Sequence, residues 1–227
     1  MEMEINLPHD VPVMTLPNTA LFPQALMPLH IFEPRYRRML TDALATNRLF
    51  AVAGLNSDRL REPGQFEPPH RVATVGIVRA CQKNSDGTSN LLLQGLCRVE
   101  IVSILREDPY RRIEVRALLS QATAPDDTTR SLRRELARLL NLKRRLTASG
   151  SGEVTNFLKT VEDPEAFVDI AAFNLCDDVI LKQKLLETLD VRHRFELFGG
   201  RLRRDIETLK LGRKLQGDLP DDRISEN

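Results

Sequence analysis

The sequences LCRVEIVSIL, at residues 96–105, and RRIEVRALL, at residues 111–119, decide the fold class of this chain. Apolar and charged side chains alternate along both. In the first stretch the apolar face holds Cys97, Val99 and Ile101. Arg98 and Glu100 lie on the opposite face, which we expect to be exposed to water. A period of two with one apolar face is typical of antiparallel β-sheet, so two strands are predicted here.

Three segments before these stretches also have strand character: residues 13–16, 49–55 and 71–82. Gly76 lies in the middle of the third segment, which indicates a β-bulge or a close approach of two backbones. The dipeptide Asp86-Gly87 is a hairpin turn signal. Five or six such strands predict a small β-barrel or a strongly curved sheet.

One helix, at residues 34–47, is predicted to pack against this sheet. It begins within the sequence MPLHIFEPRYRRML (27–40), where Pro34 suits a first helical turn because its missing N–H costs nothing there. Apolar residues then recur at helical spacing: Tyr36, Met39, Leu40, Ala43 and Leu44. Arg35 and Arg38 lie off this stripe. They belong either to a solvated face or to a contact with a partner, so both are candidate partner-binding residues.

A long loop at residues 56–70, NSDRLREPGQFEPPH, contains three prolines. Loops of this length are usually functional or mobile. Phe66 lies in the middle of the loop and is either tucked under it or a contact residue. Phe66 is therefore the third candidate for partner binding.

The composition changes near residue 122, where leucines begin to recur every three or four residues. This change predicts an α+β chain with a β domain at residues 1–121 and an α-helical bundle at residues 122–227. Five helices are expected: one ending before residue 148, then 153–160, a helix capped by Asp163, then 177–190, and a long helix over 190–215. The pair Gly199-Gly200 predicts a kink or a close helix crossing, and the last dozen residues predict a frayed tail.

Composition and charge argue against several classes of protein. The 33 basic and 32 acidic residues leave a net charge of +1, which gives no support for binding nucleic acid or an anionic membrane. The three cysteines are widely spaced, which argues against a disulfide framework or a zinc site. The N-terminus lacks the apolar core of a signal peptide, and no stretch approaches the ~20 apolar residues of a membrane span. We expect a cytoplasmic protein.

Catalytic motifs are missing from the sequence. There is no G-x-x-x-x-G-K-[ST] phosphate loop, no G-x-G-x-x-G, no H-E-x-x-H and no G-x-S-x-G elbow. The four histidines are scattered, and a metal site needs three or four ligands. We therefore expect no catalytic, cofactor-binding or metal-binding residues, although a site assembled from distant residues would leave no such signal.

One segment, residues 130–145, is locally basic, with Arg130, Arg133, Arg134, Arg138, Lys143, Arg144 and Arg145. A solvated helix face is one interpretation. An acidic partner or an RNA backbone is the other. No aromatic residues interleave with the arginines to stack on bases.

Residues 11–44 resemble the opening of the Lon protease N-terminal domain, particularly the stand-alone Lon substrate-binding domain proteins of bacteria. The shared signature is Leu16-Pro17, Leu21-Phe22-Pro23 and the run from Pro28 to Tyr36. The similarity continues through residues 74–82, 91–101, 108–115 and 181–217. It implies a PUA-like curved β-barrel with one packed helix, followed by an α-helical bundle that ends in a long helix.

The resemblance also implies a function. Full-length Lon continues into an ATPase and a Ser–Lys peptidase, for which this sequence has no motif, so the implied function is that of the recognition part. We expect a non-catalytic protein that binds unfolded or tagged polypeptide through apolar surface or a strand edge. It either delivers these clients to a separate protease or chaperone or competes with Lon for them. The alternative is RNA binding, because PUA-like barrels also bind RNA. A small-molecule hydrolase with an undetected site is a third possibility.

Overall fold

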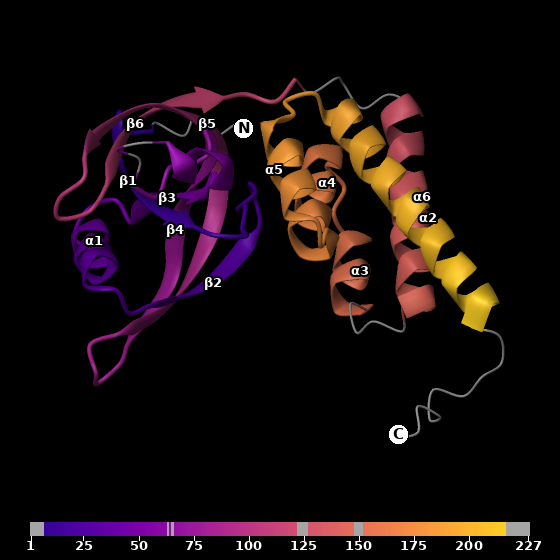
Figure 1. The fold of residues 1–227 in the computed structure, drawn as a ribbon, viewed down its shortest axis with the longest axis horizontal. Helices are drawn as coiled ribbons and strands as arrows, with labels where there is room; N and C mark the ends of the chain where they lie inside the picture. The colour runs from indigo at the N-terminus through magenta and orange to yellow at the C-terminus, as the bar shows by residue number, and fades with distance from the viewer. Residues whose placement is uncertain (1–6, 63, 65, 122–126, 148–151, 217–227) are drawn as a thin grey trace.

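The computed structural model describes residues 7–62, 64, 66–121, 127–147 and 152–216. All the described strands lie before residue 121, and all the described helices but two short ones follow it. Figure 1 shows the strands (the β part) beside the helices of the second half (the helical part). The predicted frayed tail lies outside the described residues. None of the described helices is long and apolar enough to cross a membrane.

Six strands form one curved sheet: β1 (Asp10–Leu16), β2 (Leu26–Ile31), β3 (Leu49–Gly54), β4 (Val72–Lys83), β5 (Ser89–Arg106) and β6 (Arg112–Leu118). Their order is β2-β5-β4-β3-β1-β6, and β5 also pairs with β6. Strands β1, β3, β4, β5 and β6 therefore follow one another around a ring, while β2 pairs only with β5. Only the β1–β3 pair is parallel. The prediction of a strongly curved sheet is confirmed, although the sheet is not a regular barrel.

The hairpin between β4 and β5 turns at Gly87, whose φ of +82° is the left-handed conformation expected of a turn glycine. The register of this pair shifts between Val75 and Gly76, which confirms the bulge predicted at Gly76. Gly95 lies opposite Gly76, and a Cβ on Gly95 would overlap the carbonyl oxygen of Phe22. The extended chain before β2 therefore crosses β5 in close backbone contact, with hydrogen bonds of 2.9 Å from Gln24 N to Gly95 O and from Gly95 N to Ala25 O.

Strand β2 is an edge strand, and its middle residue is the exposed Pro28. No described strand pairs with its other side. Proline is tolerated in a strand of this kind because its nitrogen can face away from the partner strand.

Helix α1 (Pro34–Leu44) begins at Pro34 as predicted and ends three residues earlier than expected. Its buried side chains are Tyr36, Met39, Leu40 and Ala43. A short 3₁₀ helix, η1 (Ser57–Arg61), occupies part of the long loop.

Five helices follow: α2 (Asp127–Thr147), α3 (Gly152–Leu158), α4 (Pro164–Leu175), α5 (Val179–Glu187) and α6 (Val191–Gln216). Helix α2 and the long α6 lie side by side (Figure 1). Asp163 caps α4 by accepting a hydrogen bond of 2.7 Å from the Ala166 N–H, as predicted. The α+β architecture expected from the sequence, a curved sheet with one packed helix and then a helical bundle, is confirmed.

A kink or a close helix crossing at Gly199-Gly200 stays a prediction. Helix α6 runs unbroken through both glycines. A Cβ on Gly199 would make an ordinary contact of 3.9 Å with Leu139 Cδ1, and one on Gly200 would meet nothing within 4 Å. Packing against neighbouring side chains therefore does not require a glycine at either position.

Two apolar cores hold the molecule together. The smaller lies inside the ring of strands and is built from short and β-branched side chains such as Val13, Ala51, Val75 and Val99. The larger extends from the β part, where it includes Phe22 and Leu93, into the helical part. One continuous core therefore joins the two parts.

Candidate functional site: the cleft between the two parts

A buried arginine crosses from the sheet to the helices. Arg98, on β5, donates hydrogen bonds of 2.7 Å from Nη1 and Nη2 to the two carboxylate oxygens of Asp169 on α4. Both side chains are only 1% exposed. Arg98 Nε also donates to the carbonyl oxygen of Leu186, at 3.0 Å. The prediction that Arg98 faces solvent is wrong, because the helical part covers that face of β5.

A second buried arginine completes this network. Arg194, on α6, donates to Asp169 Oδ1 at 2.8 Å and to the carbonyl oxygen of Thr188 at 2.7 Å. Glu165 accepts from Arg98 at 3.3 Å, from Arg194 at 3.2 Å and from the Ser120 hydroxyl. Two guanidinium groups thus face two carboxylates, so the buried charges balance, as burial of ions requires. We call these four charged residues the junction network.

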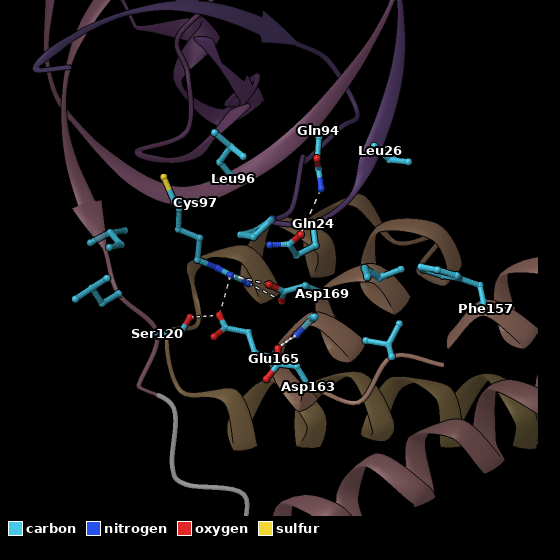
Figure 2. A pocket seen from close by; sticks show the side chains of 17 residues that line it. Gln24, Leu26, Gln94, Leu96, Cys97, Ser120, Phe157, Asp163, Glu165 and Asp169 are labelled. Atoms are coloured by element: carbon cyan, nitrogen blue, oxygen red, sulfur yellow. Dashed lines mark hydrogen bonds and ion pairs between the residues drawn. The ribbon is translucent and has the colours of Figure 1, made fainter. Parts of the chain in front are cut away.

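Three members of the network, Arg98, Glu165 and Asp169, line a cavity of about 700 Å³ between the β part and the helical part, which we call the central cleft (Figure 2). One wall comes from the β part, including Leu26, Leu96 and Leu119, and the other from α3 and α4, including Phe157 and Ile170. Leu119 is 84% exposed and Phe157 is 55% exposed. Two large apolar side chains are thus presented to solvent from opposite walls.

Polar groups line the rest of the central cleft. Gln24 and Gln94 point toward each other in Figure 2, and Gln94 Nε2 donates to Gln24 Oε1 at 3.3 Å. Asp163 and Glu165 lie on the helical wall. Because the charges of the junction network balance one another, the remaining charge on the cleft lining is the negative charge of Asp163.

The central cleft offers contact surface more than reactive groups. Burial raises the pKa of the Cys97 thiol to about 11, so this lining cysteine is protonated at neutral pH and is a poor nucleophile. Within the described ranges, no three His, Cys, Asp or Glu side chains gather as metal ligands would.

The sequence-predicted candidates lie elsewhere, and two of them meet. Arg35 and Phe66 line a separate hollow of about 830 Å³, which we call the loop hollow. Arg35 binds Glu67 through hydrogen bonds of 2.7 and 2.8 Å, and its guanidinium carbon lies 5.7 Å from the centre of the Phe66 ring. Phe66 is 64% exposed, so it is not tucked under the loop. The buried Arg111 holds this loop by donating to the carbonyl oxygens of Phe66 and Glu67.

Arg38 is not part of either hollow. Its Nε donates to both carboxylate oxygens of Asp42, at 3.2 Å, on the exposed side of α1. This is an ordinary surface pair at i,i+4 spacing, of the kind worth about 0.3–0.5 kcal/mol.

Sequence reasoning missed the junction network. Asp169 carried a usable signal, because it is an acid inside the apolar run AFVDIAAF at residues 166–173. A carboxylate buried on such a helix requires a cationic partner. Arg98 and Arg194 carried no such signal, since each lies in a sequence pattern that is typical of a solvated charged face.

Comparison with known proteins identifies the family. The family model described as "ATP-dependent protease La (LON) substrate-binding domain" matches residues 10–204. The chain belongs to the Lon substrate-binding domain family. Its fold agrees with two solved members of that family, at 18% identity each. The N-terminal domain of the Mycobacterium avium complex Lon protease superposes with a TM-score of 0.65, covering 86% of this chain and 98% of that one. The Lon N-terminal domain protein from Xanthomonas campestris gives 0.60, covering 82% and 95%.

Full-length Lon proteases are similar along nearly the whole chain. The Lon protease of Syntrophus aciditrophicus is 29% identical over 218 residues, which are 95% of this chain and 28% of that protein. The Lon protease of Desulfosudis oleivorans is 26% identical over 219 residues, 95% and 26% respectively. This Lon substrate-binding domain chain thus spans about a quarter of the length of the relatives it matches.

Proposed function

We propose that this chain is a non-catalytic polypeptide-recognition module, which holds extended apolar segments of non-native polypeptide in the central cleft. The observation that carries the proposal is the exposure of Leu119 and Phe157 on opposite walls of one cavity. Exposed apolar side chains gathered around a hollow are typical of a binding surface. Membership of the Lon substrate-binding domain family supports the same function.

The energetics suit reversible capture. Burying one large apolar side chain contributes about 1.5–3 kcal/mol. Two or three such contacts contribute about 3–9 kcal/mol before the entropy lost on association is subtracted, so the expected binding is weak and reversible. Asp163 on the helical wall favours clients that carry lysine or arginine next to their apolar residues, by charge complementarity.

We propose that the captured polypeptide is passed to a separate protease or chaperone, so that the chain serves as an adaptor or client-binding protein in proteolysis or protein quality control. The names of the relatives, all Lon proteases, support this role. ATP or peptide hydrolysis by the purified protein, removed by a single substitution, would overturn the non-catalytic part of the proposal.

The test measures binding of a reduced, alkylated and fluorescently labelled protein by anisotropy. Phe157→Ala combined with Leu119→Ser removes the exposed apolar groups of the cleft. Ile180→Ser is the matched control, because Ile180 is also 84% exposed but lies on α5, outside the cleft lining. Phe66→Ala tests the loop hollow with a second exposed phenylalanine.

We expect the cleft variant to weaken binding about tenfold, the loss of roughly 1.4 kcal/mol, and Ile180→Ser to leave binding unchanged. Binding should also survive a rise in salt, since apolar contacts do not depend on counterion release. If Phe66→Ala abolished binding and the cleft variant had no effect, the binding site would lie in the loop hollow and not in the central cleft. Steep weakening with salt would favour a nucleic-acid ligand instead.

A further inference from the structure

The locally basic segment of α2 borders a hollow of its own. This hollow, about 230 Å³, lies between α2, α3 and the start of α4, and it shares no lining residue with the central cleft. Three cations line it: Arg133 and Arg134 from α2, and Lys159 just after α3. We call it the basic groove.

None of these three cations has a carboxylate partner among the described residues. Arg133 donates from Nη2 to the carbonyl oxygen of Val161, and its buried Nε has no hydrogen-bond acceptor. Arg134 Nε donates to the Arg130 carbonyl at 3.3 Å, and Lys159 Nζ to Asn156 Oδ1 at 2.9 Å. All three acceptors are neutral, so the positive charge of the groove is uncompensated.

Helix α2 also carries a cation, Lys143, whose charge is neutralised by carboxylates. Lys143, one turn past the groove, lies 3.0 Å from Asp177 and 3.2 Å from Asp205. Burial alone would lower the pKa of Lys143, but these two carboxylates raise it above its ordinary value. Lys143 thus forms a structural ion pair, whereas the three cations of the basic groove form none with a described carboxylate.

The bottom of the basic groove is apolar, formed by Leu140, Leu158 and Phe167. The guanidinium carbon of Arg133 lies 4.8 Å from the centre of the Phe167 ring, a cation–π distance that fixes the arginine in place. A ligand that fits has an anionic group next to an apolar one. Phe167 is buried under Arg133, so no aromatic face is open for a nucleic-acid base to stack on.

We infer that the basic groove binds an acidic polypeptide segment. Aspartate or glutamate carboxylates lie between Arg133, Arg134 and Lys159, and a neighbouring apolar side chain of the segment rests on Leu140 and Leu158. Arginine–carboxylate hydrogen bonds give such a site direction as well as affinity. This site does not depend on the central cleft and stands if the cleft binds nothing.

The experiment uses the full chain and a labelled peptide that alternates glutamate and leucine. The same peptide with glutamine in place of glutamate is the ligand control. Arg134→Glu combined with Lys159→Glu reverses two exposed charges of the groove while sparing Arg133 and its contact with Phe167. Arg204→Glu is the matched protein control, because Arg204 is an exposed arginine on α6 that does not line the groove.

We expect the acidic peptide to bind at low salt, the glutamine peptide to bind at least about tenfold more weakly, and the groove variant to lose a similar factor. Arg204→Glu should bind like the unmodified protein. The inference would be refuted if the two peptides bound with equal affinity, or if the acidic peptide bound the groove variant as tightly as the unmodified protein. Tighter binding of a single-stranded RNA of equal charge, lost in the same variant, would also refute it.

Discussion

Arg98 and Asp169 lie 71 residues apart in the sequence, yet their side chains meet through two hydrogen bonds of 2.7 Å in an interior that water does not reach. Arg194 approaches the same carboxylate from α6. Asp169 is therefore the shared counter-ion of two buried cations, one from each part of the molecule.

Replacement of Asp169 by asparagine should destabilise the fold severely. The shape is kept, but two buried guanidinium groups lose the buried carboxylate that they share, and breaking a buried pair in this way costs about 3–5 kcal/mol. Urea unfolding followed by circular dichroism measures the loss. Glu165→Gln is the control: Glu165 is 30% exposed, so water replaces part of the lost interaction and the effect should be clearly smaller. Equal effects of the two substitutions would contradict the central place of Asp169.

Asp178 should make stability depend on pH below about 4. The Leu181 N–H, at 3.0 Å, lowers the pKa of this N-cap carboxyl, and Arg201 lowers it further. A lowered native pKa contributes stability that is present above the unfolded value of about 3.9 and is lost as pH falls through the native value. Asp178→Asn should therefore lower the unfolding free energy at pH 7 by at most about 1 kcal/mol, given solvent screening.

The difference between Asp178→Asn and the unmodified protein should shrink toward zero as the pH falls through the native pKa, below about 4. Asp178→Ala separates the two contributions, because alanine also removes the hydrogen bond to the helix start. A difference that stays constant from pH 7 to pH 2 would show that the charge of Asp178 is irrelevant.

Cys97 should be alkylated slowly at neutral pH. With a pKa of about 11, roughly one thiol in a thousand is ionised at pH 8, and only the thiolate reacts. In a Cys81→Ser/Cys176→Ser background, the rate of reaction with iodoacetamide should keep rising beyond pH 9. A plateau near pH 9 would contradict the burial of this thiol. A client in the central cleft should slow the reaction further, because Cys97 lines that cavity.

Gly200→Ala should stabilise the protein. The residue lies inside α6, and the added methyl group meets no atom within 4 Å, so the gain is the helix propensity difference of about 0.5–1 kcal/mol. Thermal unfolding measures it as a rise of a few degrees. Gly95→Ala should do the reverse, because its methyl group would collide with the backbone of Phe22. A destabilised Gly200→Ala would reveal a hidden requirement for that glycine.

Local patterns predicted most elements because their causes are local. Pro34 and Asp163 mark helix starts through geometry and hydrogen bonds within one turn. The period of two placed Val99 and Ile101 inside the ring of strands, where both are buried. Asp86-Gly87 located the hairpin. In each case a few consecutive residues contain the whole physical reason.

The central cleft could not be predicted in the same way. A period of two separates the faces of a strand but does not say what covers each face, so Arg98 was assigned to water. The lining residues come from four distant segments, residues 23–26, 94–98, 118–120 and 157–170. Their meeting depends on how the helices dock against the sheet, which no local pattern encodes.

Pro28, in the middle of the edge strand β2, limits how this protein meets extended chains. A strand added beside β2 would need a regular row of N–H donors, and proline interrupts that row. The proline therefore opposes the addition of a further strand at this edge of the sheet. For the polypeptide-recognition module proposed above, this interruption opposes pairing of a bound extended segment with the edge strand β2.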